Sequence, residues 1–249
     1  MSRTLTRRLS LPFRLLLYAV VLLMLEVEWQ GSINASTAQA DLQEQVCDPL
    51  ADYFLGLEDY PETIRLHLEV IKRDPSNALA HYHLGYAYGM TGRRSAELAE
   101  YRLAVELGLT DWDLFLNLGL VYLESGRLQD AVYALRTATM LAPARSEPHF
   151  NLGLVYERQG KLPDALQEML IAEQLDPNQP DIRNMIGVIY AEMGQYERAQ
   201  QQWSELLVTN PTYELARLNL ARLKAELQST FSSDKAITAA KVSEPPTNR

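Results

Sequence analysis

The stretch Asn117-Leu-Gly-Leu-Val-Tyr122 is repeated, letter for letter, as Asn151-Leu-Gly-Leu-Val-Tyr156, thirty-four residues later. Related stretches stand at the same interval on either side, His83-Leu-Gly-Tyr-Ala-Tyr88 before and Met185-Ile-Gly-Val-Ile-Tyr190 after. A fixed period of this length is typical of a repeat architecture, in which each unit is one small packed motif. The period predicts five units, which cover residues 44–77, 78–111, 112–145, 146–179 and 180–213.

Each unit, numbered from 1, has the pattern of two packed helices. Position 8 is glycine in the last four units, position 11 is aromatic in all five, and position 15 is glycine in the last four. Positions 4, 7, 8 and 11 share one helical face, so each unit is predicted to open with an amphipathic helix, helix A. The glycine at position 15 suits a turn, and a second helix, helix B, follows. In four of the five units this helix ends before a proline at position 32.

This pattern resembles the tetratricopeptide repeat family over about two-thirds of the chain. The resemblance implies an all-α fold, a right-handed α-solenoid of helix-turn-helix repeats. Because a single helix pair cannot bury both of its faces, neighbouring repeats must stack to form the core. Repeats one and two depart from the family pattern, since Thr63 and Glu97 replace the alanine at position 20 and Leu109 replaces the proline at position 32.

Beyond the repeats, one more helix is predicted over residues 214–227. Its apolar residues, Leu220 and Ala221, occupy positions 7 and 8, while Arg217 and Lys224 occupy the positions that are bulky and apolar elsewhere. A helix with one apolar and one polar face suits the end of a repeat array, so we expect a C-terminal capping helix. The segment 229–249 is rich in Ser, Thr, Ala and Pro and is predicted to be disordered.

Residues 1–40 are predicted to be a signal peptide or a membrane anchor. Basic residues precede the apolar run Leu15–Leu25, which at about 1.5 Å per residue is too short to cross a hydrocarbon core of ~30 Å. The small residues of Ala38-Gln-Ala40 suit signal peptidase, with cleavage after Ala40. An uncleaved anchor, in contact with the membrane through residues 11–29, is the alternative, and an organellar transit peptide is a further one.

The signal-peptide and anchor interpretations place the folded part on the non-cytoplasmic side of a membrane, because positive charge ahead of an apolar segment stays in the cytoplasm. We therefore expect a protein exported to the periplasm or a lumen, or anchored through its N-terminus with the repeats outside the cytoplasm. The formal net charge is −9, from 32 acidic and 23 basic residues, which disfavours nucleic acid as a partner.

Neither a catalytic centre, a cofactor nor a metal site is predicted. Cys47 is the only cysteine, so an internal disulfide and a cysteine-based zinc site are excluded. His81 and His149 occupy position 4 two repeats apart, too far for one metal. His81 and His83 are two residues apart on one helix and point to different faces. We therefore expect a protein that is not an enzyme.

The resemblance implies a concave groove lined by helix A of each repeat, chiefly by positions 2, 5, 9, 12 and 13. The residues at positions 5, 6 and 9 that would form its floor are Tyr82, Tyr86, Leu116, Asn117, Leu120, Phe150, Asn151, Leu154 and Val188. The acidic residues at positions 2 and 13 that would form its rim are Asp113, Glu124, Glu147, Asp181 and Glu192. Arg158 is the basic exception at position 13.

An apolar floor with an acidic rim suits a protein or peptide that has apolar anchors and basic residues. We therefore expect a scaffold that binds such a partner outside the cytoplasm, in assembly or biogenesis of an envelope or membrane complex. This choice of pathway is an analogy with the family. The alternative is an accessory or regulatory subunit of an envelope enzyme, with the enzyme bound in the groove.

Overall fold

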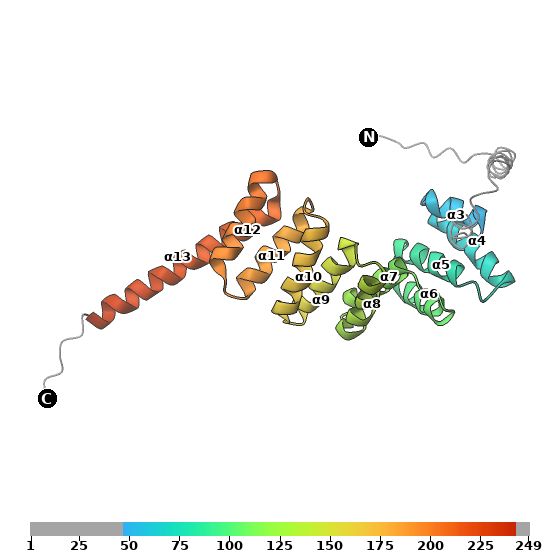
Figure 1. Ribbon diagram of the computed structural model, residues 1–249, viewed down its shortest axis with the longest axis horizontal. Helices are drawn as coiled ribbons and strands as arrows, with labels where there is room; N and C mark the ends of the chain where they lie inside the picture. Colours follow the sequence, from blue (N-terminus) through green and yellow to red (C-terminus); the bar gives the residue numbers. More distant parts are fainter. Residues whose placement is uncertain (1–46, 243–249) are drawn as a thin grey trace, which may run out of the picture. The chain divides into compact units, whose positions relative to one another are not determined.

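The computed structural model describes residues 47–242 (Figure 1). The signal peptide or anchor predicted over residues 1–40 lies outside the described residues. Of the helices in the described part of the chain, none is both long enough and apolar enough to cross a membrane.

Residues 47–242 form eleven helices and no strand, which confirms the all-α fold. The helices are α3 Pro49–Gly56, α4 Tyr60–Arg73, α5 Ala78–Met90, α6 Arg94–Glu106, α7 Trp112–Glu124, α8 Leu128–Leu141, α9 Ser146–Arg158, α10 Leu162–Leu175, α11 Pro180–Glu192, α12 Tyr196–Thr209 and α13 Glu214–Val242. The first ten of these helices fall two to each predicted range of 34 residues, helix A before helix B.

The chain divides into two compact units, residues 1–109 and residues 110–249. In the described part of the first unit, α3 packs against α4, α4 against α5, and α5 against α6. In the second unit each helix from α7 to α13 packs against the next, as Figure 1 shows. Each unit is therefore a stack of helix pairs, the arrangement of an α-solenoid.

The turn between helix A and helix B explains the glycine at position 15. Gly126, Gly160 and Gly194 have φ of 71°, 71° and 72°, in the left-handed region that glycine adopts without a steric cost. Repeat one has Glu58 at this position, with φ of 57°. The backbone of the turn therefore has the same conformation in repeat one, although the side chain of Glu58 disfavours a positive φ.

The glycine at position 8 lies against the side chain at position 24, on helix B of the same repeat. A Cβ atom added at Gly119 would lie 2.5 Å from Cγ of Leu135, and one added at Gly187 would lie 2.5 Å from Nε1 of Trp203. The indole of Trp203 also donates a hydrogen bond to the carbonyl oxygen of Asn184 (3.2 Å). Only a residue without a side chain lets the two helices approach this closely.

The two departures at position 20 are both buried in the first unit. Glu97 on α6 accepts a hydrogen bond from Arg94 (2.9 Å) and fills space opposite Gly89 on α5. A Cβ atom at Gly89 would lie only 2.4 Å from a carboxylate oxygen of Glu97, so the glycine makes room for the larger side chain. Thr63 on α4 is also buried, and its hydroxyl has no hydrogen-bond partner among residues 47–242.

Helix α13 covers the end of the second unit. Ala216 and Leu223 are buried against Trp203 and Leu206 of α12, and Leu220 packs at the edge of this cluster. Ala221, at position 8, is instead exposed, because no helix B follows it. Helix α13 therefore packs against α12 in the way that helix A of a further repeat would.

The same helix extends beyond its predicted end near residue 227, through Val242, and so into the segment for which the sequence predicts disorder. The physical reason is the absence of a helix-breaking residue, because no Gly or Pro occurs between Glu214 and Pro245. The composition of residues 229–249 predicts disorder, whereas the structure has helix as far as Val242. Residues 243–249 lie outside the described part of the chain.

The glycine contacts predict that Gly187→Ala destabilises the fold more than Gly153→Ala. At Gly187 the new methyl group meets the ring of Trp203. At Gly153 it meets the flexible side chain of Met169, at Cε (2.9 Å) and Cγ (3.1 Å), and more distantly the backbone oxygen of Ala165 (3.3 Å). We expect a loss of about 1–3 kcal/mol for Gly187→Ala from overpacking. For Gly153→Ala the higher helix propensity of alanine, about 1 kcal/mol, offsets much of the cost.

Urea denaturation followed by circular dichroism measures both changes. Equal losses in the two variants would contradict the proposed difference between a rigid and a flexible neighbour.

Candidate functional site

Two of the predicted floor residues belong to the core. The ring of Tyr82 lies 5.8 Å from that of Tyr101, centroid to centroid, and only 9% of the residue is exposed. Leu116 is 8% exposed, between the buried Leu114 and Leu118 on α7. Three successive residues of α7, 114–116, are buried, and residues so spaced cannot share one face of a helix. These two side chains are therefore removed from the predicted exposed floor.

The remaining floor residues are partly exposed. In the first unit, Tyr86 is 36% exposed, and its ring centroid lies 6.4 Å from that of Tyr60. In the second unit, the predicted floor residues that are half-buried are Asn117, Leu120, Phe150, Asn151, Leu154 and Val188. Phe150 and Leu154 are four residues apart on α9 and therefore share a face. We call Leu120, Phe150, Leu154 and Val188 the apolar strip.

Direct contacts link the A helices of the second unit. Arg158 on α9 donates a hydrogen bond to the carbonyl oxygen of Leu123 in the last turn of α7 (3.4 Å). This bond satisfies a carbonyl at the negative end of the helix, where a cation is favoured. The basic exception among the predicted rim residues therefore has a structural partner.

The acidic rim residues differ in their surroundings. Glu124, Glu147, Asp181 and Glu192 are exposed, and Asp113 is half-buried. Asp181 accepts a hydrogen bond from the hydroxyl of Tyr213, just before α13. Within α9, Asn151 donates to the carbonyl oxygen of Glu147 (2.9 Å). That amide group therefore stabilises its own helix.

Glu157 on α9 and Glu192 on α11 form a pair of like charges. Partial burial raises the pKa of Glu192, and both the negative charge of Glu157 and a hydrogen bond between the two carboxyl groups raise it further. Two carboxylates this close repel each other once both are ionised. A cationic side chain from a partner would relieve the repulsion, so this pair is the most specific polar feature beside the apolar strip.

Two of the histidines weighed in the sequence analysis link helix A to helix B of their own repeat. Nδ1 of His81 lies 2.6 Å from a carboxylate oxygen of Glu100, and Nδ1 of His149 lies 2.7 Å from one of Glu168. His81 also donates to the carbonyl oxygen of Pro75 (3.1 Å). These contacts join neighbouring helices of the fold.

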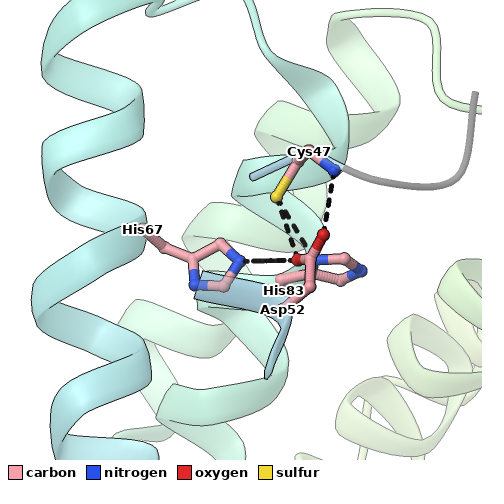
Figure 2. A group of neighbouring side chains, drawn as sticks. All are labelled: Cys47, Asp52, His67 and His83. Carbon is pink, nitrogen blue, oxygen red and sulfur yellow. Dashed lines mark hydrogen bonds and ion pairs between the residues drawn. The ribbon is translucent and has the colours of Figure 1, made fainter. Parts of the chain in front are cut away.

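Sequence reasoning missed a polar cluster in the first unit, formed by Cys47, Asp52, His67 and His83 (Figure 2). The histidine pairs compared in the sequence did not include His67 with His83, which lie on α4 and α5. The exclusion of a cysteine-based zinc site considered cysteine ligands alone, and not one cysteine together with Asp and His ligands. Burial alone would raise the pKa of Asp52, but hydrogen bonds from the two histidines outweigh it and hold the pKa below its usual value. Burial, together with the charge of Asp52, raises the pKa of the Cys47 thiol. The signal that could have revealed part of the cluster is the presence of Asp52 and His67 at positions 9 and 24, which are apolar in the last three repeats.

Comparison with known families identifies the repeats. The profile described as tetratricopeptide repeat matches residues 49–109 and 112–180, more than half of the chain, and a second profile of the same description matches residues 174–201. The chain belongs to the tetratricopeptide repeat family. No curated protein sequence matches it.

Solved structures of tetratricopeptide repeat proteins share the fold. YrrB, described as having an unusual peptide-binding site, is 22% identical, covers 75% of this chain and 97% of its own, and has a TM-score of 0.65. MamA from Desulfovibrio magneticus is 16% identical, with coverages of 68% and 99% and a TM-score of 0.61. The C-terminal part of a repeat protein from Cytophaga hutchinsonii is 16% identical, with coverages of 73% and 71% and a TM-score of 0.65.

The carboxyl pair predicts how stability depends on pH. Because the pKa of Glu192 is raised in the folded protein, the folded state holds its proton more tightly than the unfolded chain does. This contribution to stability is present at low pH and is lost as the pH rises above the unfolded value of about 4.3. Glu192→Gln removes the ionisation, so the variant should gain in melting temperature relative to wild type between about pH 4 and 7.

Thermal unfolding of both proteins across this range measures the difference. Glu147→Gln, which removes an exposed acid from the first turn of α9, is the control and should show no such gain, because an acid there is favourable to the helix. A Glu192→Gln protein that follows wild type at every pH would exclude the repulsion.

Proposed function

We propose that this tetratricopeptide repeat protein is a non-enzymatic scaffold that binds a protein or peptide partner outside the cytoplasm. We further propose that the scaffold serves the assembly or biogenesis of an envelope or membrane complex. The observation that carries the proposal is the apolar strip beside the Glu157–Glu192 pair. It supports a partner with apolar anchor residues and at least one Lys or Arg.

Two further observations support the binding role. Leu120, Leu154 and Val188 recur at position 9 of successive A helices, so an extended or helical segment could contact them in turn. Among proteins of similar fold, YrrB is described as having a peptide-binding site. That description supports the class of function, and the residues of the strip supply the proposed specificity.

The location is proposed from residues 1–40 alone. Their basic start, short apolar run and small-residue site support export, with the repeats beyond a membrane. Export also limits the choice of partner to proteins of the same compartment.

We expect Phe150→Ala to weaken partner binding while the helices stay folded. Phe150 is half-buried near the middle of the apolar strip, where a partner would cover the rest of its ring. Removing an aromatic anchor at the centre of an interface costs about 2 kcal/mol or more, which is a loss of roughly 30-fold in affinity. The measurement is capture from the native membrane fraction, followed by titration of the purified partner.

Tyr133→Ala is the matched control, because Tyr133 is an exposed aromatic residue (73%) on α8, a B helix, outside the strip. It should bind the partner as wild type does. Undiminished binding by a folded Phe150→Ala protein, or equal losses in both variants, would move the binding site away from the strip. Circular dichroism separates either result from unfolding.

N-terminal sequencing of the protein from its native host tests the location. We expect the mature chain to begin at Asp41, as cleavage after Ala40 requires. An intact N-terminus on protein extracted from membranes would support the anchor instead. Repeats that a protease reaches only from the cytoplasmic side would exclude both forms of the proposal.

A further inference from the structure

Repeat one breaks the apolar pattern of the array at two places, positions 24 and 9. Position 24 carries Leu135, Met169 or Trp203 in the last three repeats, but the fully buried His67 in repeat one. Position 9 is apolar in those repeats and is Asp52 in repeat one. The repeats of the same chain thus show that the fold itself does not require a polar group at either position. Two further side chains belong to the same cluster: Cys47, at position 4 of repeat one, and His83, at position 6 of repeat two, and other repeats also have polar residues at these two positions.

The four side chains meet at one point between α3, α4 and α5, as Figure 2 shows. Oδ1 of Asp52 lies 3.2 Å from Sγ of Cys47, 3.4 Å from Nε2 of His67 and 2.8 Å from Nδ1 of His83. Nδ1 of His83 lies 3.5 Å from Sγ of Cys47 and 3.3 Å from Nε2 of His67. All four donor atoms lie within 4.8 Å of one another.

These separations are close to those of a tetrahedral zinc site. Zinc bonds of about 2.3 Å to sulfur and about 2.0–2.1 Å to nitrogen and oxygen place neighbouring donor atoms about 3.3–3.7 Å apart. Four of the five measured distances lie between 3.2 and 3.5 Å, and the fifth is shorter, at 2.8 Å. The sixth pair, Sγ of Cys47 and Nε2 of His67, lies within 4.8 Å, so a cation at the centre would also draw these two atoms together.

Contacts outside the cluster hold two of the ligands in the orientation that a metal requires. Nδ1 of His67 lies 2.9 Å from the carbonyl oxygen of Thr63, which can only accept, so Nδ1 carries a proton and Nε2 faces the cluster. Oδ2 of Asp52 accepts hydrogen bonds from the backbone amides of Cys47 (3.0 Å) and Asp48 (3.4 Å), which leaves Oδ1 for the cluster. Such outer contacts are usual around the ligands of metal sites.

We propose that Cys47, Asp52, His67 and His83 bind one divalent transition-metal ion, with Zn²⁺ as the best fit. Thiolate, carboxylate and imidazole are the ligands that zinc prefers, and the two negative ligands balance its charge. Four protein ligands leave no open position, so the site is structural. A carboxylate oxygen only accepts hydrogen bonds, so without a cation Nε2 of His67 and Nδ1 of His83 must each carry a proton to contact Asp52. A bound metal would replace these two protons.

The site has a physical purpose at this end of the array. Helix α3 has 8 residues, whereas the other A helices of the repeats, α5, α7, α9 and α11, have 13 each, so it has less surface to bury. A metal would join Cys47, two residues before α3, and α3 itself to α4 and α5. Because such a site exists only in the folded chain, binding the ion stabilises the first repeat.

The test uses the full chain as isolated, freed of metal with a chelator, and Co²⁺ or Zn²⁺ alone as the probe. Wild type should bind a single equivalent of Co²⁺ with the visible spectrum of tetrahedral coordination and a thiolate-to-cobalt band. Since the chain has one cysteine, that band can arise only from Cys47. Zn²⁺ should displace the cobalt and raise the melting temperature.

Cys47→Ser and His83→Gln should each lower the affinity for Co²⁺ by more than the roughly 10–100-fold that is typical for loss of an outer-shell contact. Cys47→Ser should also lose the thiolate band. The matched control is His149→Gln, which removes a histidine that pairs with Glu168 in the second unit and should leave metal binding unchanged. Melting in chelator checks that each variant folds as the metal-free wild type does.

A wild-type chain that binds neither ion, or binds Co²⁺ without a thiolate band, would overturn the proposal and leave the cluster as a hydrogen-bonded contact between helices. An unchanged spectrum in Cys47→Ser, or an equal loss in His149→Gln, would do the same. If a variant fails to fold, the thiolate band of wild type still decides. None of these results depends on the partner of the scaffold.

Discussion

In each of repeats two to five, a glycine on helix A lies close to a large side chain on helix B, and this contact holds the two helices of the repeat together. In each of them the residue at position 24, from Tyr101 to Trp203, lies where the glycine leaves room and is almost wholly buried. The spacing of the two helices depends on this contact, because interiors are packed too densely to absorb an extra methyl group without shifts. Repeat one has Ala51 and His67 instead, and the polar cluster lies at that exception.

The sequence predicted the fold because each repeated residue has a local physical reason. Glycine at position 15 serves a turn with positive φ, and glycine at position 8 serves a helix contact within the same repeat. The burial of Tyr82 and Leu116 could not be predicted from such local reasons, because it depends on which neighbouring helices cover position 5. The register of the family marks both residues as floor residues, whereas packing places them in the core.

The sequence marks Asp52 and His67 as polar residues at apolar positions, but the meeting of all four side chains could not be predicted from it, for a related reason. Three members of this cluster come from three helices and the fourth, Cys47, lies two residues before the first of them, and no short motif joins them. A spacing of 16 residues between His67 and His83 has no meaning until α4 and α5 are packed. The rim differs, since its acidic character follows from register alone, but the pairing of Glu157 with Glu192 required the stacked helices.

Packing between helices that follow each other along the chain also affects how the protein folds. In each unit the main helix contacts join consecutive elements, so most native contacts close short loops of chain. Closing short loops costs little conformational entropy, and proteins dominated by local contacts fold quickly. Folding can therefore begin at any well-formed helix pair, such as α9 with α10, and spread to its neighbours. An array of this kind needs no single nucleus, and a slow step at one end leaves the rest free to form.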